Sequence, residues 1–126
     1  FAGIFLLSLV TVETGGMYLL RLVRGQSPAT PFQEKFARAG HAHAAVLLVL
    51  ALAIQPYADA AGLEGPLGWL ARAGVGVAAL LMPGGFFFSS MGAGRDEPNG
   101  WIVLIYLGAA LLAVSLATLG VGLLVA

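Results

Sequence analysis

The sequence predicts an all-α membrane protein, a bundle of four transmembrane helices that run alternately up and down. Of its 126 residues, 60% are hydrophobic and 10% are charged, whereas an ordinary soluble domain has about 25% charged residues. The chain contains four apolar stretches, each near the roughly 20 residues that a helix needs to cross a bilayer. None of them alternates between polar and apolar residues as a barrel strand does, so helices are the only structure that pairs every backbone amide within lipid.

The first expected span covers residues 1–23 and ends in the turn-forming run Gly25-Gln26-Ser27-Pro28. We expect a true span rather than a signal peptide, because no small-residue cleavage pattern follows it. The second expected span covers residues 31–54. It begins at Thr30-Pro31-Phe32-Gln33, which offers an N-cap, a proline in the first turn and a glutamine at the third helical position. We expect Pro56 to end this helix.

The third expected span, residues 67–91, opens after Gly65-Pro66 and contains Pro83, Gly84 and Gly85, to which we assign a structural role. The fourth expected span, residues 101–125, begins near Trp101. Four spans use about three quarters of the chain and leave only short connections, as in a polytopic bundle. Residues 1–126 are therefore expected to form a single transmembrane domain.

The basic residues predict the orientation of the spans. Four of them border the first connection, namely Arg21, Arg24, Lys35 and Arg38. The second connection carries Asp59 and Glu64 and has no basic residue before Arg72, which we expect to be structural, its side chain reaching the outer surface. By the positive-inside rule, the first and third connections are cytoplasmic and both termini lie outside.

Composition also narrows the function classes. The formal net charge is zero, so no basic surface is available for nucleic acid. The absence of Cys excludes disulfides and thiolate chemistry. No Ser/His/Asp set, pair of catalytic carboxylates or phosphate loop is visible, which makes an enzyme the least favoured class. The expected partners are the lipid bilayer and further copies of the chain or the subunits of a larger membrane complex.

Ionisable residues at membrane depth usually mark a function, because a charge there costs on the order of 3 kcal/mol on insertion scales. Glu13 is expected about 15 Å from the inner end of its span, and His43 about 10 Å. The two side chains are thus expected to meet. His41, Thr14 and Ser89 complete the expected polar site, beside the carbonyl that Pro83 frees.

The two histidines are two positions apart, about 200° around a helix, so they cannot both bind one centre. Three interpretations stay open for them: hydrogen bonds that fix helix packing, an axial ligand to haem or a metal ion, and a proton relay with Glu13. For Glu13 the alternatives are a neutral carboxyl bonded to a carbonyl or a Thr, and a group that handles protons or cations.

The stretch Phe36-Ala37-Arg38-Ala39-Gly40-His41-Ala42-His43-Ala44, with Val12-Glu13-Thr14-Gly15-Gly16, resembles a group of small four-helix integral membrane proteins of GC-rich bacteria. This resemblance implies a location in the bacterial inner membrane and no particular activity. The His-Ala-His sequence is also similar to the haem-ligating helices of haem-copper oxidase subunit I. That similarity implies a haem ligand, but no further His is present for a second axial ligand or a copper centre.

These observations favour proton or cation translocation through a Glu/His site. Four short helices enclose little volume, so we expect the path to form between subunits of an oligomer. Two alternatives stay open: a haem- or metal-binding redox component of the membrane, and a non-catalytic accessory subunit of a larger membrane complex.

Overall fold

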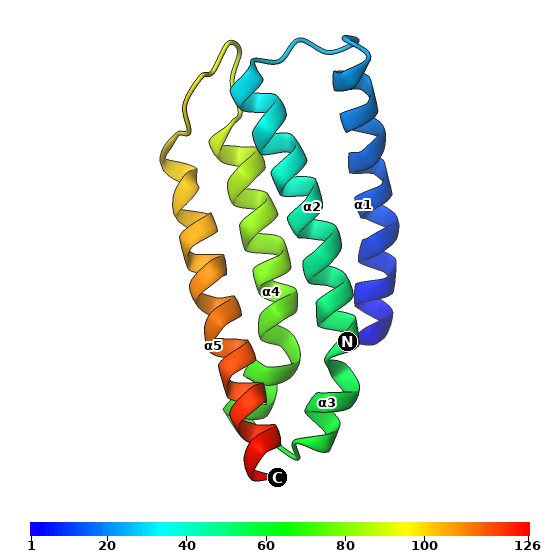
Figure 1. Ribbon diagram of the computed structural model, residues 1–126, viewed down its shortest axis with the longest axis vertical. Helices are drawn as coiled ribbons and strands as arrows, with labels where there is room; N and C mark the ends of the chain where they lie inside the picture. The colour runs from blue at the N-terminus through cyan, green and yellow to red at the C-terminus, as the bar shows by residue number, and fades with distance from the viewer.

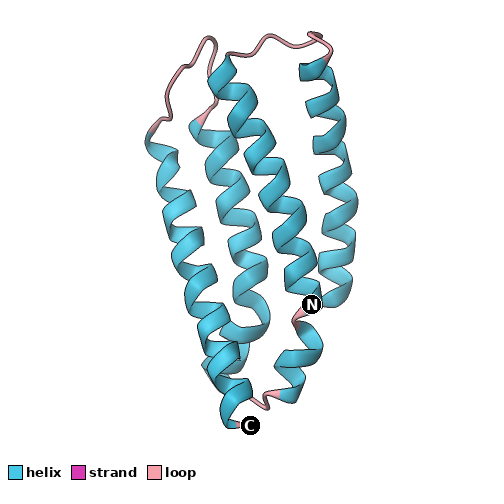
Figure 2. Cartoon of the chain, in the orientation of Figure 1, coloured by secondary structure: helices cyan, strands magenta, loops and turns pink.

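The computed structural model describes all residues 1–126 and consists only of helices and connecting loops (Figure 2). Four helices are long and apolar enough to cross a membrane, by length and composition. The predicted fold class is confirmed. The elements in chain order are α1 (Ala2–Val23), α2 (Pro31–Ala53), the short α3 (Gln55–Ala60), α4 (Gly65–Ser89), the 3-10 turn η1 (Gly100–Ile102) and α5 (Val103–Val125).

The four long helices stand side by side in the order α1, α2, α4, α5 (Figure 1). The most extensive contacts join α4 to α5 and α4 to α2, while α1 packs chiefly against α2. Helix α4 is therefore the centre of the assembly, and α1 and α5 form its two edges. The loops 24–30 and 90–99 lie together at one end, and α3 and both termini lie toward the other end.

The start of α2 has the predicted cap. The Thr30 side chain accepts a hydrogen bond from the Gln33 backbone N–H at 3.1 Å, and the Gln33 side chain accepts one from the Thr30 N–H at 3.1 Å. The predicted effect of Pro56 was wrong in one respect. Helix α2 ends at Ala53, but Pro56 then lies in the first turn of α3, where a missing N–H breaks no bond, so the chain stays helical to Ala60.

Two other predicted boundaries shift by a few residues. Helix α4 begins at Gly65 rather than at residue 67, because Pro66 is compatible with the first helical turn, and it ends at Ser89 rather than at residue 91. The last span opens with the 3-10 turn η1, where the Asn99 side chain accepts a hydrogen bond from the Trp101 N–H at 2.9 Å. Helix α5 itself starts at Val103.

Small residues let α4 and α5 approach closely. A Cβ added at Gly108 of α5 would lie 3.0 Å from the backbone nitrogen of Met82, and one added at Gly85 of α4 would lie 2.7 Å from the backbone nitrogen of Ile105. Neither contact leaves room for a methyl group. Since lipid tails are as apolar as the side chains, this close van der Waals packing is what favours helix pairing in a membrane.

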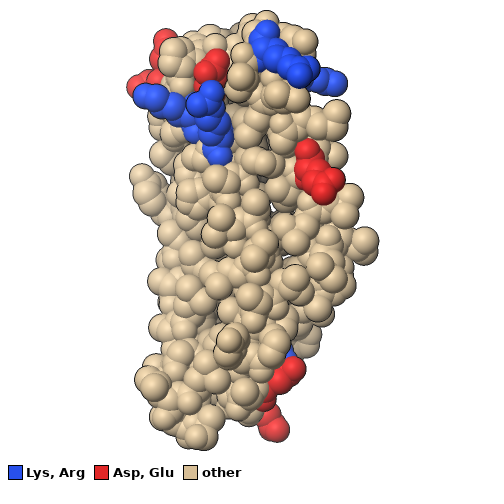
Figure 3. Space-filling model, turned by 45° about the vertical axis from the view of Figure 1, so that its right-hand side comes forward, with Lys and Arg blue, Asp and Glu red and all other residues tan.

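The sides of the molecule are apolar and the charges gather near the ends. Figure 3 shows a broad uncharged middle on the visible face, with Lys, Arg, Asp and Glu concentrated above and below it and one acidic patch below the upper group. Helix α1 buries only Phe5 and Leu22. Large exposed side chains such as Leu7, at 73%, cover the rest of it. Such a surface is compatible with lipid on α1.

We expect Gly108→Ala to destabilise the protein by about 1–3 kcal/mol, the usual effect of overpacking. Gly120 is the matched control, since it lies on the same helix and a Cβ there would meet nothing within 4 Å. We expect Gly120→Ala to be neutral or to stabilise by up to about 1 kcal/mol, because Gly is a poor helix former. Unfolding in mixed micelles measures both variants. Equal stabilities of the two variants would contradict this account of the α4–α5 contact.

Candidate functional site

Glu13 lies at the middle of α1, on its outer side. The side chain is exposed and makes no hydrogen bond or ion pair within the chain. The residues one and two turns away on the same face are also exposed, among them Leu6 at 52%, Met17 at 66% and Leu20 at 48%. The carboxyl group therefore points away from the other helices. The sequence left open that Glu13 is a neutral, buried carboxyl bonded to a carbonyl or a Thr. Its exposed position without a partner does not fit that alternative.

His41 lies on the side of α2 that faces α1, against a pair of glycines. A Cβ added at Gly15 would lie 3.0 Å from His41 Nδ1, and one added at Gly16 would lie 3.6 Å from Nε2. The two glycines thus make room for the imidazole ring between the helices. No hydrogen bond joins this ring to another group of the chain, so its role in packing is steric.

His43 connects α2 with α4. Its Nδ1 lies 2.7 Å from the carbonyl oxygen of Ala39. Because a carbonyl only accepts, Nδ1 carries the proton in this arrangement. The imidazole also packs against the ring of Phe86, with a centroid distance of 4.9 Å, and Phe86 in turn meets Phe36 edge-on at 5.3 Å. Intrahelical bonding and aromatic packing therefore fix the His43 ring.

The expected contact between Glu13 and His43 is not formed within the chain. His41 faces α1, and His43 is about 200° farther around α2, so His43 faces away from α1. The two residues can share a depth and still lie on opposite sides of α2. No group of three or more His, Cys, Asp or Glu side chains is arranged to hold a metal ion. A metal ion held by side chains of these types would therefore need further ligands from a second copy or another protein.

Two further residues of the expected set have local roles. Ser89 is fully buried at the end of α4, where its hydroxyl lies 3.4 Å from the Phe86 carbonyl and its own carbonyl accepts from the Asn99 N–H at 2.9 Å. It belongs to the helix terminus and not to a shared polar site. Arg72 forms an ion pair with Asp59 and donates to the Ala58 carbonyl at 3.3 Å. These contacts tie α4 to α3.

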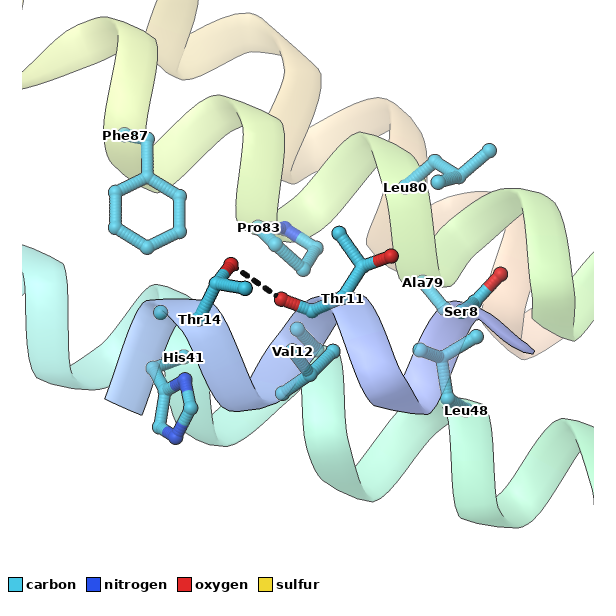
Figure 4. Close-up of a pocket in the computed structure, with 12 residues that line it drawn as sticks. Ser8, Thr11, Val12, Thr14, His41, Leu48, Ala79, Leu80, Pro83 and Phe87 are labelled. Carbon is cyan, nitrogen blue, oxygen red and sulfur yellow. Dashed lines mark hydrogen bonds between the residues drawn. The ribbon is translucent and has the colours of Figure 1, made fainter. Parts of the chain in front are cut away.

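A groove of about 310 Å³ runs between α1 and α4 with α2 as its floor (Figure 4). Thr11 and Thr14 project from α1 toward Pro83 of α4, and the Thr14 hydroxyl donates to the Thr11 carbonyl at 2.6 Å. Each helix contributes residues that recur every three or four positions, so one face of each lines the groove. The lining residues are Ser8, Thr11, Val12, Thr14, Gly15, His41, Ala44, Leu48, Ala79, Leu80, Pro83 and Phe87.

Pro83 removes one backbone hydrogen bond beside this groove. Proline has no N–H, so the carbonyl of Ala79, four residues earlier, loses its usual helical partner. Ala79 and Pro83 both line the groove. Gly84 does not line it, and Gly85 faces Ile105 of α5 instead. Of the expected polar set, the fold brings together His41, Thr14 and Pro83, and it leaves out Glu13, His43 and Ser89.

A clasp between the two loops at one end of the molecule was not anticipated. The Thr30 hydroxyl donates to the Arg95 carbonyl at 2.5 Å, and Gln33 Nε2 donates to the carbonyls of Ser90 and Gly92 at 2.9 and 2.6 Å. The same two residues that cap α2 thus bind the loop after α4. The spacing of Thr30 and Gln33 in the sequence predicts the cap, but it does not predict their bonds to the loop 90–99.

Comparison of the chain with protein-family models, with curated proteins and with solved structures finds no match.

We expect His43→Phe to lose about 1 kcal/mol of stability, the net contribution of a typical hydrogen bond. His43→Ala should lose roughly 1 kcal/mol more, because it also removes the aromatic contact with Phe86. Unfolding in mixed micelles tests this order. If both variants were as stable as the parent chain, the histidine would not be a packing element, and a ligand role would gain weight.

Proposed function

We propose that this protein moves protons or cations across a membrane as an oligomer, with Glu13 lining a path between subunits. The observation that carries the proposal is the position of Glu13: the midpoint of an apolar helix, exposed and without a partner. A charge that faced lipid at this depth would cost on the order of 3 kcal/mol. The cost disappears if the side chain faces a hydrated axis between copies.

Helix α1 is suited to such an interface because it contributes little to the packing of its own chain. Only two of its residues are buried, and its Glu13 face carries the exposed side chains Leu6, Met17 and Leu20. Copies that met through this face would place their carboxyl groups in a ring at one level. Rings of Asp or Glu side chains select cations in channels, and a carboxyl group can also bind and release a proton.

The histidines are not part of the proposed path. His41 lies in the groove on the other side of α1, and His43 faces α4. We therefore assign the translocation step to Glu13 and not to a Glu/His relay.

A haem- or metal-binding redox component is the second candidate. His43 keeps Nδ1 on the Ala39 carbonyl at 2.7 Å, and metal-ligating histidines orient their rings by the same kind of bond, which leaves Nε2 to bind the metal. The second ligand would come from another copy. A Soret band or a stoichiometric metal ion in the purified protein would favour this candidate over ion movement.

We further propose that the protein lies in a bacterial inner membrane with the loops 24–30 and 90–99 in the cytoplasm. The end that carries these loops holds five basic residues, Arg21, Arg24, Lys35, Arg38 and Arg95. The opposite end holds Asp59, Glu64 and the paired Arg72. The excess of basic residues supports this orientation by the positive-inside rule.

The Glu13→Gln variant tests the ion path in proteoliposomes. We expect its proton or cation flux to fall by about tenfold or more, since a loss of about 1.4 kcal/mol already changes a rate tenfold. Glu13→Asp should keep part of the flux because it keeps the carboxyl group. Glu64→Gln is the matched control, since Glu64 is an exposed carboxylate outside the long apolar helices.

Unchanged flux in Glu13→Gln would remove the ion-path proposal. Absence of any flux in the parent chain would also remove it, and stable co-purification with other membrane proteins would then favour an accessory subunit.

The orientation is testable with single cysteines, because the chain has none of its own. We expect a membrane-impermeant maleimide added outside spheroplasts to label Ala60→Cys, an exposed position on α3, and not Gln26→Cys in the first loop. Permeabilised cells, in which both positions should react, are the control. The reverse labelling pattern would show that the loops 24–30 and 90–99 lie outside.

A further inference from the structure

The groove between α1 and α4 continues along most of the length of α1. Its central part shares Ser8, Leu48 and Leu80 with a cavity of about 180 Å³ toward the start of α1. It shares Gly15 and Phe87 with a cavity of about 370 Å³ toward the loops. The three cavities therefore follow one another along α1, from Phe1 to the end of the molecule where the loops 24–30 and 90–99 meet, and together we call them the furrow.

The furrow is narrow. Its central part holds about 310 Å³ along the residues from Ser8 to Gly15, a length of about 10 Å at the rise of an α-helix, which gives a cross-section of roughly 30 Å². The furrow therefore has room for a single extended hydrocarbon chain.

Polarity changes along the furrow. The part near the start of α1 is lined almost entirely by apolar residues, including Phe1, Ile4, Phe5, Val77 and Leu80. The hydroxyl-bearing residues Ser8, Thr11 and Thr14 line the centre. The end near the loops has the Tyr18 and Gln33 side chains in its lining. This change from an apolar to a more polar lining fits a molecule that has an apolar tail and a polar head and lies parallel to the helices.

Two cations lie near the polar end of the furrow, although neither lines it. Arg21 is exposed and follows Tyr18 by three residues and Thr14 by seven, so it lies on the same stripe of α1 as these two lining residues, at the outer edge of the furrow. Arg95 lies beside Gly92, where a Cβ would be 3.5 Å from its Nε, and that Nε donates to the Met91 carbonyl at 2.7 Å. Neither guanidinium has a carboxylate partner, since the only ion pair in the chain joins Arg72 to Asp59.

From the furrow and these cations we infer that the protein binds one anionic phospholipid. One acyl chain lies in the furrow between α1 and α4, and the phosphate lies near Arg21 and Arg95. Guanidinium groups bind phosphate oxygens in pairs, which suits them to this headgroup. The furrow opens on the side of the molecule, so a lipid reaches it from the bilayer. The groove residues lie on a different face of α1 from Glu13, so this inference does not rest on the proposed ion path.

Native mass spectrometry of protein extracted from bilayers of mixed phosphatidylglycerol and phosphatidylcholine tests the inference. We expect the parent chain to retain one phosphatidylglycerol. Thr11→Trp fills the furrow and should lower retention by about tenfold. Val10→Trp is the matched control: Val10 is 60% exposed on the same helix and does not line the furrow, so this variant should keep the lipid.

The headgroup is tested separately. Arg21→Gln with Arg95→Gln should remove the preference for phosphatidylglycerol over phosphatidylcholine, whereas Lys35→Gln, an exposed cation away from the furrow, should keep it. Ala44→Leu is a second, smaller way to block the furrow, and circular dichroism checks that each variant folds. Equal retention in Thr11→Trp, Ala44→Leu and Val10→Trp would show only annular lipid and would overturn the proposal. A lipid preference that survives the double Arg variant would do the same.

Discussion

The close approach of α4 to its two neighbours is the constraint on which the other features depend. Gly85 and Gly108 leave no room for a Cβ between α4 and α5, and Gly40 of α2 lies against the ring of Phe87 and the Cβ of Phe86. In a bilayer no hydrophobic force selects these contacts, so shape complementarity of small residues decides which helices meet. Because α4 occupies the centre, α1 is left with α2 as its main partner. The groove beside α1 and the exposure of Glu13 both follow from that position.

The periodicity of a helix then separates polar residues that are close in the sequence. Thr11 and Glu13 are two positions apart, about 200° around α1, so one lines the groove and the other faces outward. His41 and His43 diverge on α2 in the same way. The polar residues that were expected at one membrane depth thus occupy three separate environments: a groove, an aromatic contact and an exposed helix face.

The features that could be predicted from the sequence are those that depend on residues close together in the chain. The spans, the Thr30–Gln33 cap and the divergence of the two histidines depend on residues within a few positions of each other, and the structure contains all three. The neighbours of each helix depend on tertiary packing. The depth of Glu13 and His43 predicted a contact, but depth says nothing about which side of α2 each residue occupies. The clasp from Gln33 to Gly92 likewise joins residues that are far apart in the sequence.

The two proposed sites share α1, which buries the fewest residues of the four long helices. A chain in the furrow would fill the space between α1 and α4 and so set the distance between them. Glu13 lies on the opposite face of the same helix, where further copies of the protein are proposed to meet. Because a helix moves as a rigid body, a shift of its groove face also moves its Glu13 face. Bound lipid would thereby favour one arrangement of the carboxyl groups, as any ligand does that binds one conformation better than another.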